Sequence, residues 1–219
     1  FRSMTFKRSN KIIVNTEATK KKIPKSYHHK TYVELAIAID EQKLNTAKNI
    51  NFYQERLNLC FVGNYEHIKG INIILKIIKK LKVNNHKFFF NFIGSGSLEK
   101  YIKESLNKNE LVDCVKIHKK ISHDKIFEFM KKNQLLVFPA LRDSGGMVIF
   151  ESIASNLLVA SLKLAGPGTI LDTKSSILID PKKLTYDMIV SRFCADILKC
   201  YRDKIIYKNK IKHSYSIIK

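Results

Sequence analysis

Two carboxylates stand eight positions apart in one short stretch of the sequence, at Asp143 and Glu151. Residues 144–146, Ser-Gly-Gly, separate an expected buried strand from an apolar helix that begins near Met147. Unpaired amides at a helix start and the positive end of the helix dipole together favour an anion. Glu151 falls inside the apolar run, where an unpaired carboxylate is costly. The stretch therefore predicts an anion site with a buried acid behind it.

A second interpretation assigns no chemistry to this stretch. Asp143 would then be a helix N-cap, and Glu151 a solvated residue on the helix surface. The two interpretations differ in what surrounds the helix, so the elements around it decide between them.

From residue 57 onward, short apolar runs alternate with segments of helical periodicity. A short continuous apolar run is typical of a strand buried on both faces, as in a parallel sheet covered by helices. The expected strands are 59–63, 87–93, 115–118, 134–138, 158–162 and 177–179, and the expected helices are 71–81, 98–106, 122–130, the segment after residue 146, and 186–201. With right-handed crossovers, this order predicts a doubly wound, Rossmann-like α/β domain.

Glycine-bearing turns follow four of the expected strands, at Gly63, at residues 94–96, at residues 144–146 and at residues 166–168, where Gly-Pro-Gly breaks the chain. Ligands of such sheets bind outside the carboxyl ends of the strands, so four turns on one edge predict a binding site there. The sequence has no Gly-x-Gly-x-x-Gly after the first strand and no Gly-x-x-x-x-Gly-Lys-Ser/Thr. This argues against nicotinamide dinucleotides and P-loop chemistry.

The first quarter of the chain has a different pattern. Residues 11–15 predict a short strand, and Thr16 caps a brief polar helix at 17–22 that Pro24 ends. Residues 32–39 form another apolar run, and residues 40–56 are polar and linker-like. The composition then shifts at residue 57, where the strand–helix alternation begins.

The composition limits the partners. The 219 residues carry a net charge of +21, which fits nucleic acid, an anionic membrane surface or anionic small molecules. The lysines are spread along the chain, and no aromatic-basic RNA motif or recognition-helix pattern is present, which disfavours nucleic acid. No apolar run approaches the roughly 20 residues that span a bilayer. The four cysteines form no Cys-x-x-Cys pair and no zinc spacing, which indicates a reducing, cytoplasmic compartment.

Four segments together resemble the donor domain of family 4 glycosyltransferases. Residues 61–70, Phe-Val-Gly-Asn-Tyr-Glu-His-Ile-Lys-Gly, are similar to that domain's F-V-G-x-x-x-x-x-K-G opening, and residues 92–97, Phe-Ile-Gly-Ser-Gly-Ser, to its I-I-G-x-G-P turn. Residues 138–151 resemble its P-S-x-x-E-x-x-G-x-x-x-x-E signature, and residues 166–168 the loop before its last donor contacts. The resemblance covers residues 57–181 in the right order and spacing.

The resemblance implies a GT-B fold, with two Rossmann-like domains and the active site between them. Residues 57–202 would be the carboxyl-terminal, nucleotide-sugar-binding domain. Residues 1–56 would be the tail of the acceptor domain plus a linker, and residues 203–219 a Lys-rich carboxyl-terminal tail. Most of the acceptor domain is not in this sequence, so we expect the chain to be a fragment that transfers little sugar alone.

The resemblance also implies roles for the site residues. Glu151 would accept hydrogen bonds from the ribose hydroxyls. Asp143 takes the place of a family Glu near the donor sugar and the reaction centre, and is one methylene shorter. Lys69 matches the lysine that neutralises the diphosphate leaving group, which is electrostatic catalysis. The remaining donor-binding residues would act through backbone groups or lie beside the nucleotide: Gly63, Asn64, Gly94, Ser95, Gly96, Ile117, Gly145, Gly146, Met147 and Val148.

Two of these positions depart from the family pattern or carry little information. Asn64 replaces a common family arginine, so one positive charge is missing unless Arg142 or another cation compensates. Ile117 lies where the family recognises the base, often through backbone groups. The sequence has no Asp-x-Asp, and the family generally works without metal. We therefore expect no metal and no other cofactor.

The sequence predicts a retaining glycosyltransferase that moves a hexose-type unit from a nucleotide-diphosphate sugar to a glycan or lipid-linked acceptor. Biosynthesis of a cell-surface polysaccharide or lipopolysaccharide fits such an enzyme. The alternatives are a GT-B remnant that binds nucleotide-sugar or polyanions without catalysis, and a GT-B enzyme that is not a transferase, such as an epimerase. We expect a cytoplasmic protein, with Lys204, Lys208, Lys210 and Lys212 available for peripheral contact with an anionic membrane.

Overall fold

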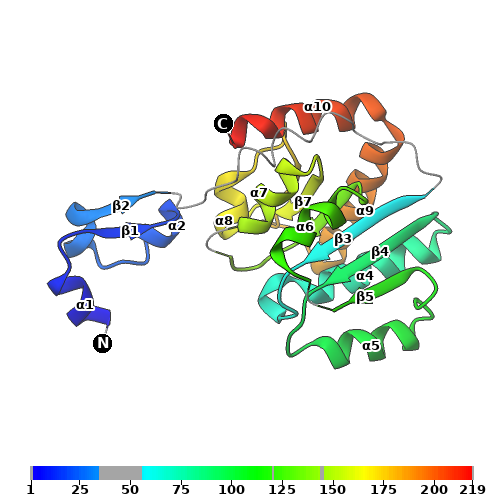
Figure 1. The fold of residues 1–219 in the computed structure, drawn as a ribbon, viewed down its shortest axis with the longest axis horizontal. Helices are drawn as coiled ribbons and strands as arrows, with labels where there is room; N and C mark the ends of the chain where they lie inside the picture. Colours follow the sequence, from blue (N-terminus) through cyan, green and yellow to red (C-terminus); the bar gives the residue numbers. More distant parts are fainter. Residues whose placement is uncertain (1, 35–55, 120, 144–145, 219) are drawn as a thin grey trace.

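The structure is a computed structural model that describes residues 2–34, 56–119, 121–143 and 146–218. Its main body is a six-stranded sheet with helices on both faces (Figure 1). The strands are β3 (Leu57–Val62), β4 (Phe88–Ile93), β5 (Val115–His118), β6 (Leu135–Phe138), β7 (Leu158–Leu162) and β8 (Ile177–Ile179). All six predicted strands are therefore present, with bounds that differ by at most two residues.

The sheet is parallel throughout, in the order β5-β4-β3-β6-β7-β8. The chain runs outward from β3 to β5, returns to the centre at β6, and then runs outward to β8. This is the doubly wound arrangement that the sequence predicts, with its switch point between β3 and β6. The loops that follow these two strands therefore meet at the place where such sheets bind ligands.

The helices of the main body alternate with the strands. They are α4 (Ile71–Val83), α5 (Glu99–Lys108), α6 (His123–Met130), α7 (Met147–Ala154), α8 (Ala165–Ile170), α9 (Tyr186–Arg202) and α10 (Lys204–Ser214), with short 3-10 turns η2 (His67–Lys69) and η3 (Tyr215–Ile217). α4 packs against α5 and α9, and Lys80 of α4 donates to the Ser191 hydroxyl of α9 at 2.7 Å. α6 packs against α7.

The core lies on the sheet, where every residue of β3, β6 and β7 is buried. Phe61 on β3 contacts the phenylalanine rings of both neighbouring strands, with centroids 6.0 Å from Phe92 and 6.1 Å from Phe138. Burial of such large apolar side chains stabilises a domain of this size. The four cysteines are buried and free.

Residues 2–34 form a small amino-terminal unit beside the sheet domain, with α2 close to α8 (Figure 1). The unit contains α1 (Arg2–Arg8), β1 (Ile12–Val14), α2 (Glu17–Lys20), η1 (Lys25–Lys30) and β2 (Thr31–Val33), and β1 pairs with β2 in parallel. The Thr16 hydroxyl accepts from the Thr19 amide at 3.1 Å, which confirms the predicted cap. The linker predicted at 40–56 and most of the apolar run at 32–39 lie outside the described residues.

The structure corrects two predictions. Residues 166–168 do not break the chain but lie in α8, because Pro167 is in the first turn, where its missing amide costs nothing. Residues 203–219 are not a tail, since α10 and η3 pack on the domain with Tyr207 and Ile211 buried. Ser122 occupies the N-cap position of α6, but its side chain makes no capping hydrogen bond. Within the described parts of the chain, no helix is both long and apolar enough to cross a membrane.

Candidate functional site

The loops after β3 and β6 are joined at the switch point. The Ile68 carbonyl accepts from the amides of Leu141 at 2.8 Å and Arg142 at 3.3 Å. Gly70 has φ +77°, and a Cβ at this position would lie 2.1 Å from the Pro139 carbonyl oxygen. Only glycine permits this approach, so the Lys-Gly pair of the sequence motif has a structural reason. The contact brings Lys69 next to the residues that follow β6.

Lys69 and Asp143 form an ion pair across the switch point. The Lys69 ammonium contacts Asp143 Oδ2, while Asp143 Oδ1 accepts from the Gly146 amide at 2.9 Å. The side chains are only 21% and 11% exposed, so the pair is largely shielded from solvent. Lys69 Nζ also lies 5.5 Å from the Phe138 ring centroid. The two predicted catalytic residues, 74 positions apart, thus meet at the start of α7.

The helix after this pair is buried as predicted. The side chain of Glu151 is 8% exposed within α7, among Ile149, Phe150 and Ile153. Val148 is half-buried, and Met147 is 48% exposed. The interpretation of Glu151 as a solvated residue is therefore wrong. Gly146, with φ +55°, is itself the N-cap, and Asp143 caps its amide from three residues away.

The glycine turns after β3 and β4 are packed against each other. A Cβ on Gly94 would lie 2.0 Å from the Gly63 carbonyl oxygen, and one on Gly96 would lie 2.6 Å from the Tyr65 amide nitrogen. The Tyr65 amide donates to the Ser95 carbonyl at 2.9 Å. These glycines are thus required by the close approach of two turns, whether or not a ligand binds. Gly63 and Gly94 remain half-exposed, and Asn64, Ser95 and Gly96 are exposed on this edge of the sheet.

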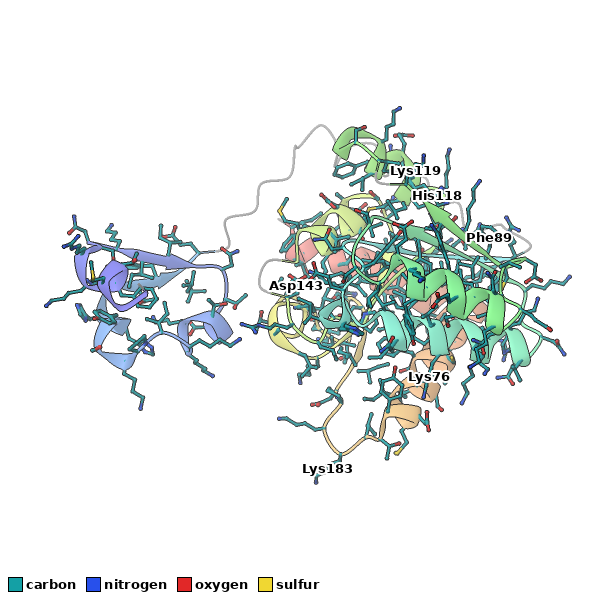
Figure 2. All side chains as sticks on the ribbon, turned by 90° about the horizontal axis from the view of Figure 1, so that it is seen from below. Lys76, Phe89, His118, Lys119, Asp143 and Lys183 are labelled. Carbon is teal, nitrogen blue, oxygen red and sulfur yellow. The ribbon has the colours of Figure 1, made fainter. Side chains whose placement is uncertain are left out.

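Ile117 lies one residue before the end of β5, half-buried, in register with Phe92 of β4. The next residue, His118, is fixed by a contact of 2.9 Å between its Nε2 and Asn91 Oδ1. Burial, and then the charge of Lys116, lower the pKa of His118 below its ordinary value. In Figure 2 His118 and Lys119 lie together, apart from Asp143, which is on the side that faces the amino-terminal unit.

A cleft of about 650 Å³ separates the sheet domain from the amino-terminal unit. Lys69 and Asp143 lie in its wall, with Ile68, Arg142, Ala165 and Gly166 on the same side. The opposite wall carries apolar residues of α1 and β1, together with Lys22. Arg142 is exposed and close enough to line the same cleft, so a second cation accompanies Lys69. The site is therefore cationic, with one carboxylate at its centre.

Gly145 lies outside the described residues, so its predicted amide contact stays a prediction. In the described parts of the chain, no group of three or more His, Cys, Asp or Glu side chains is arranged to hold a metal ion. Among the described residues, the charges that the cleft presents to a ligand are those of Lys22, Lys69, Arg142 and Asp143, together with the dipole of α7.

Comparison with known proteins identifies the family of this chain. Residues 42–208 match the family described as glycosyl transferases group 1. This chain belongs to the glycosyl transferases group 1. Among its relatives, an uncharacterized glycosyltransferase of Methanocaldococcus jannaschii is 33% identical over 111 residues, which are 51% of this chain and 30% of that protein. The phosphatidylinositol N-acetylglucosaminyltransferase gpi3 subunit of Schizosaccharomyces pombe is 22% identical over 162 residues, 74% of this chain and 36% of that protein.

A solved structure shows the same fold. The chain superposes on TarM from Staphylococcus aureus, solved with UDP, with a TM-score of 0.78 at 15% identity. The superposition covers 98% of this chain and 41% of TarM, and at this identity it concerns the fold. The fold is that of GT-B glycosyltransferases. The chain spans about a third of the curated relatives that it matches, at 30% and 36% of their lengths.

Three further residues shape the candidate site, although none of them was named among the predicted site residues. Phe138 lies beneath the Lys69 ammonium, Gly70 allows the two loops to meet, and the Gly166 amide donates to the Asp143 carbonyl at 2.8 Å. The Lys-Gly pair of the motif at 61–70 could have indicated Gly70, and the position of Phe138 at the end of the strand before Asp143 could have indicated that residue. Gly166 belonged to the predicted turn at 166–168, but its contact with Asp143 was not visible in the sequence, because it depends on how α8 packs beside β7.

Proposed function

We propose that this chain is the carboxyl-terminal, donor-binding half of a retaining family 4 glycosyltransferase. It would bind a nucleotide-diphosphate sugar across the carboxyl edge of the sheet and support transfer to a glycan or lipid-linked acceptor. The observation that carries the proposal is the arrangement at the switch point. There Lys69, Asp143 and the capped start of α7 lie together, with the buried carboxylate of Glu151 on the same helix.

Each residue has a defined task in this proposal. The diphosphate lies at the start of α7, where the Gly146 amide, the helix dipole and Lys69 stabilise the charge that grows on the leaving group. Glu151 accepts hydrogen bonds from the ribose hydroxyls. Asp143 lies beside the donor sugar. Because these groups supply the positive potential, the reaction needs no metal ion in this proposal.

Nucleotide binding tests the proposal directly. Calorimetry of the chain with UDP, GDP, CDP and ADP should identify one tight binder, and Glu151→Gln should weaken it. Hydrogen bonds to a charged group are worth roughly 1.5–3 kcal/mol, which corresponds to roughly 10- to 150-fold in affinity. Glu104→Gln on the exposed face of α5 is the matched control and should change nothing.

Thermal unfolding of both variants checks that they remain folded. If folded Glu151→Gln binds the nucleotide as tightly as the parent, the ribose assignment is wrong. If none of the four nucleotides binds, the donor-binding proposal itself is refuted.

The acceptor and the rest of the enzyme are also proposals. The gpi3 relative bears a name that includes phosphatidylinositol, which supports a lipid-linked acceptor for this chain. The chain spans a third of such relatives, so we expect residues 1–219 to bind donor yet transfer little sugar. Transfer to added acceptors at ordinary enzyme rates, measured by release of the nucleoside diphosphate, would contradict this. If the chain binds donor but no transfer occurs even when an acceptor domain is supplied, the non-catalytic alternative would be favoured.

We propose that three of the four lysines predicted for membrane contact form the contact surface. Lys204, Lys208 and Lys212 recur every four residues on the exposed side of α10. Lys210 does not belong with them, because its ammonium donates to the Ser176 carbonyl at 2.9 Å and also to that of Thr173. A stripe of three lysines fits anionic headgroups.

Sedimentation with vesicles tests this stripe. Binding should need anionic lipid and should fall when Lys208 and Lys212 are both changed to Glu. The control is the same change at Lys100 and Lys108 of α5, which alters the net charge equally. Equal loss in both double variants would show a general charge effect and refute a specific membrane face.

A further inference from the structure

One carboxylate holds both groups that the proposed function assigns to the donor's phosphates. Asp143 Oδ2 contacts the Lys69 ammonium, and Asp143 Oδ1 accepts from the Gly146 amide at 2.9 Å. The pair is mostly buried, so its members are poorly screened by solvent. A carboxylate resembles a phosphate in offering two negatively charged oxygens on one centre. Asp143 therefore makes the contacts that an anionic ligand at this place would need.

We infer that Asp143 is a built-in counter-ion, which competes with the donor's diphosphate for Lys69 and for the amide of Gly146. Donor binding then proceeds by exchange of partners, and the displaced carboxylate becomes available to the donor sugar. The inference rests on the proposed function, since it takes the start of α7 to be the phosphate site.

The backbone around Asp143 restricts how this exchange occurs. Its carbonyl accepts from the Gly166 amide at 2.8 Å, and the preceding Arg142 amide is bonded to the Ile68 carbonyl at 3.3 Å. The main chain of residues 142 and 143 is thus held on the sheet domain by two hydrogen bonds, one at the Arg142 amide and one at the Asp143 carbonyl. We therefore expect the carboxylate to leave Lys69 by rotation of its own side chain, while these two backbone hydrogen bonds remain.

The length of the side chain explains why this chain has such a counter-ion. Asp accepts readily from an amide two or three residues further along at a helix start, and a longer Glu does so less well. The Asp143-to-Gly146 contact has this spacing. The replacement of the family Glu by Asp143 therefore places the carboxylate on the helix start, where it neutralises Lys69. When only a fraction of the molecules has Lys69 available for a ligand, the apparent affinity for the nucleotide is reduced by that fraction.

Calorimetry of the whole chain with the tightest-binding of the four nucleoside diphosphates tests the inference. Asp143→Asn removes the charge but keeps the shape, and Asp143→Glu moves the carboxylate away from the helix start. We expect both variants to bind the nucleotide at least about threefold more tightly than the parent. In a Lys69→Ala background, Asp143→Asn should give no such gain, because the competed cation is gone.

Asp187→Asn is the matched control. It also removes an aspartate that contacts a lysine, Lys76, but both side chains are more than half exposed, at 85% and 53%, and far from the site in sequence and fold. It should leave nucleotide affinity unchanged. Should Asp143→Asn fail to fold, as judged by thermal unfolding, Asp143→Glu decides the question.

Unchanged or weaker nucleotide binding by the folded Asp143 variants would overturn the inference. That result would leave the proposed function standing if the parent binds and Glu151→Gln weakens binding. Absence of nucleotide binding by the parent would overturn both. Equal gains from Asp143→Asn and Asp187→Asn would show a net-charge effect and also overturn the inference.

Discussion

Tyr207 provides a quantitative test of whether α10 belongs to the sheet domain. Its side chain is 3% exposed, and its hydroxyl donates to the Gln134 carbonyl at the start of β6 at 2.8 Å. Burial raises the pKa of this phenol, so it stays neutral and remains a donor. The contact joins residues 73 positions apart, between the last long helix and a central strand. Truncating Tyr207 should therefore destabilise the whole domain.

The magnitude follows from what each variant removes. Tyr207→Phe deletes the hydroxyl's hydrogen bond to Gln134 and its longer one, 3.5 Å, to the Asn156 carbonyl, but the Gln134 carbonyl keeps the Leu158 amide as a donor at 3.2 Å. The cost should be about 1 kcal/mol, without the larger penalty of an unsatisfied group. Tyr207→Ala also removes a buried ring, which should cost about 3–5 kcal/mol. Ile205→Ala on the same helix is the control, because Ile205 is 73% exposed and should change stability by less than about 0.5 kcal/mol.

Urea unfolding followed by circular dichroism measures these differences, with the slope of the transition compared between variants. A Lys-rich tail without tertiary contacts would give three equal curves. If Tyr207→Ala shifts the midpoint no more than Ile205→Ala does, the packing of α10 described here is wrong.

Two further pairs of variants test the packing of the turns after β3 and β4 and the lowered pKa of His118. Gly94→Ala should cost about 2 kcal/mol or more in thermal unfolding, since its Cβ would lie 2.0 Å from a carbonyl oxygen at φ +138°. Gly63→Ala has φ +149° but meets only a ring atom at 3.4 Å, so it should cost less, and the reverse order would contradict the turn packing. The pKa of His118 is lowered from 6.5 by burial and then by Lys116, so its contribution to stability is complete above pH 6.5 and is lost as the pH falls. His118→Gln should flatten the loss of unfolding free energy between pH 6.5 and 5 relative to exposed His67→Gln, and parallel profiles would refute the assignment.

The secondary structure of the sheet was predictable from the sequence. The central strands β3, β6 and β7 are buried on both faces, so each is a short apolar run without alternation, and the sequence places all six strands within two residues. α10 was not predictable in the same way. Its buried residues, Tyr207, Ile211 and Ser214, are few and lie among many lysines, so composition concealed the helical face. Gly-Pro-Gly at 166–168 likewise reads as a break, although a proline in a first turn is compatible with a helix.

The identity of the site residues came from the sequence, but their relationship came from the fold. Residue types and spacing predicted Asp143 and a buried Glu151, because a carboxylate in an apolar run and glycines after strands are visible without coordinates, and the resemblance to the donor domain added Lys69. That Asp143 contacts Lys69 and the Gly146 amide at once was not visible, since it depends on the parallel pairing of β3 with β6 and on Gly70 letting their loops meet. Local sequence determines which groups are available, whereas the order of strands in the sheet determines which of them neutralise one another.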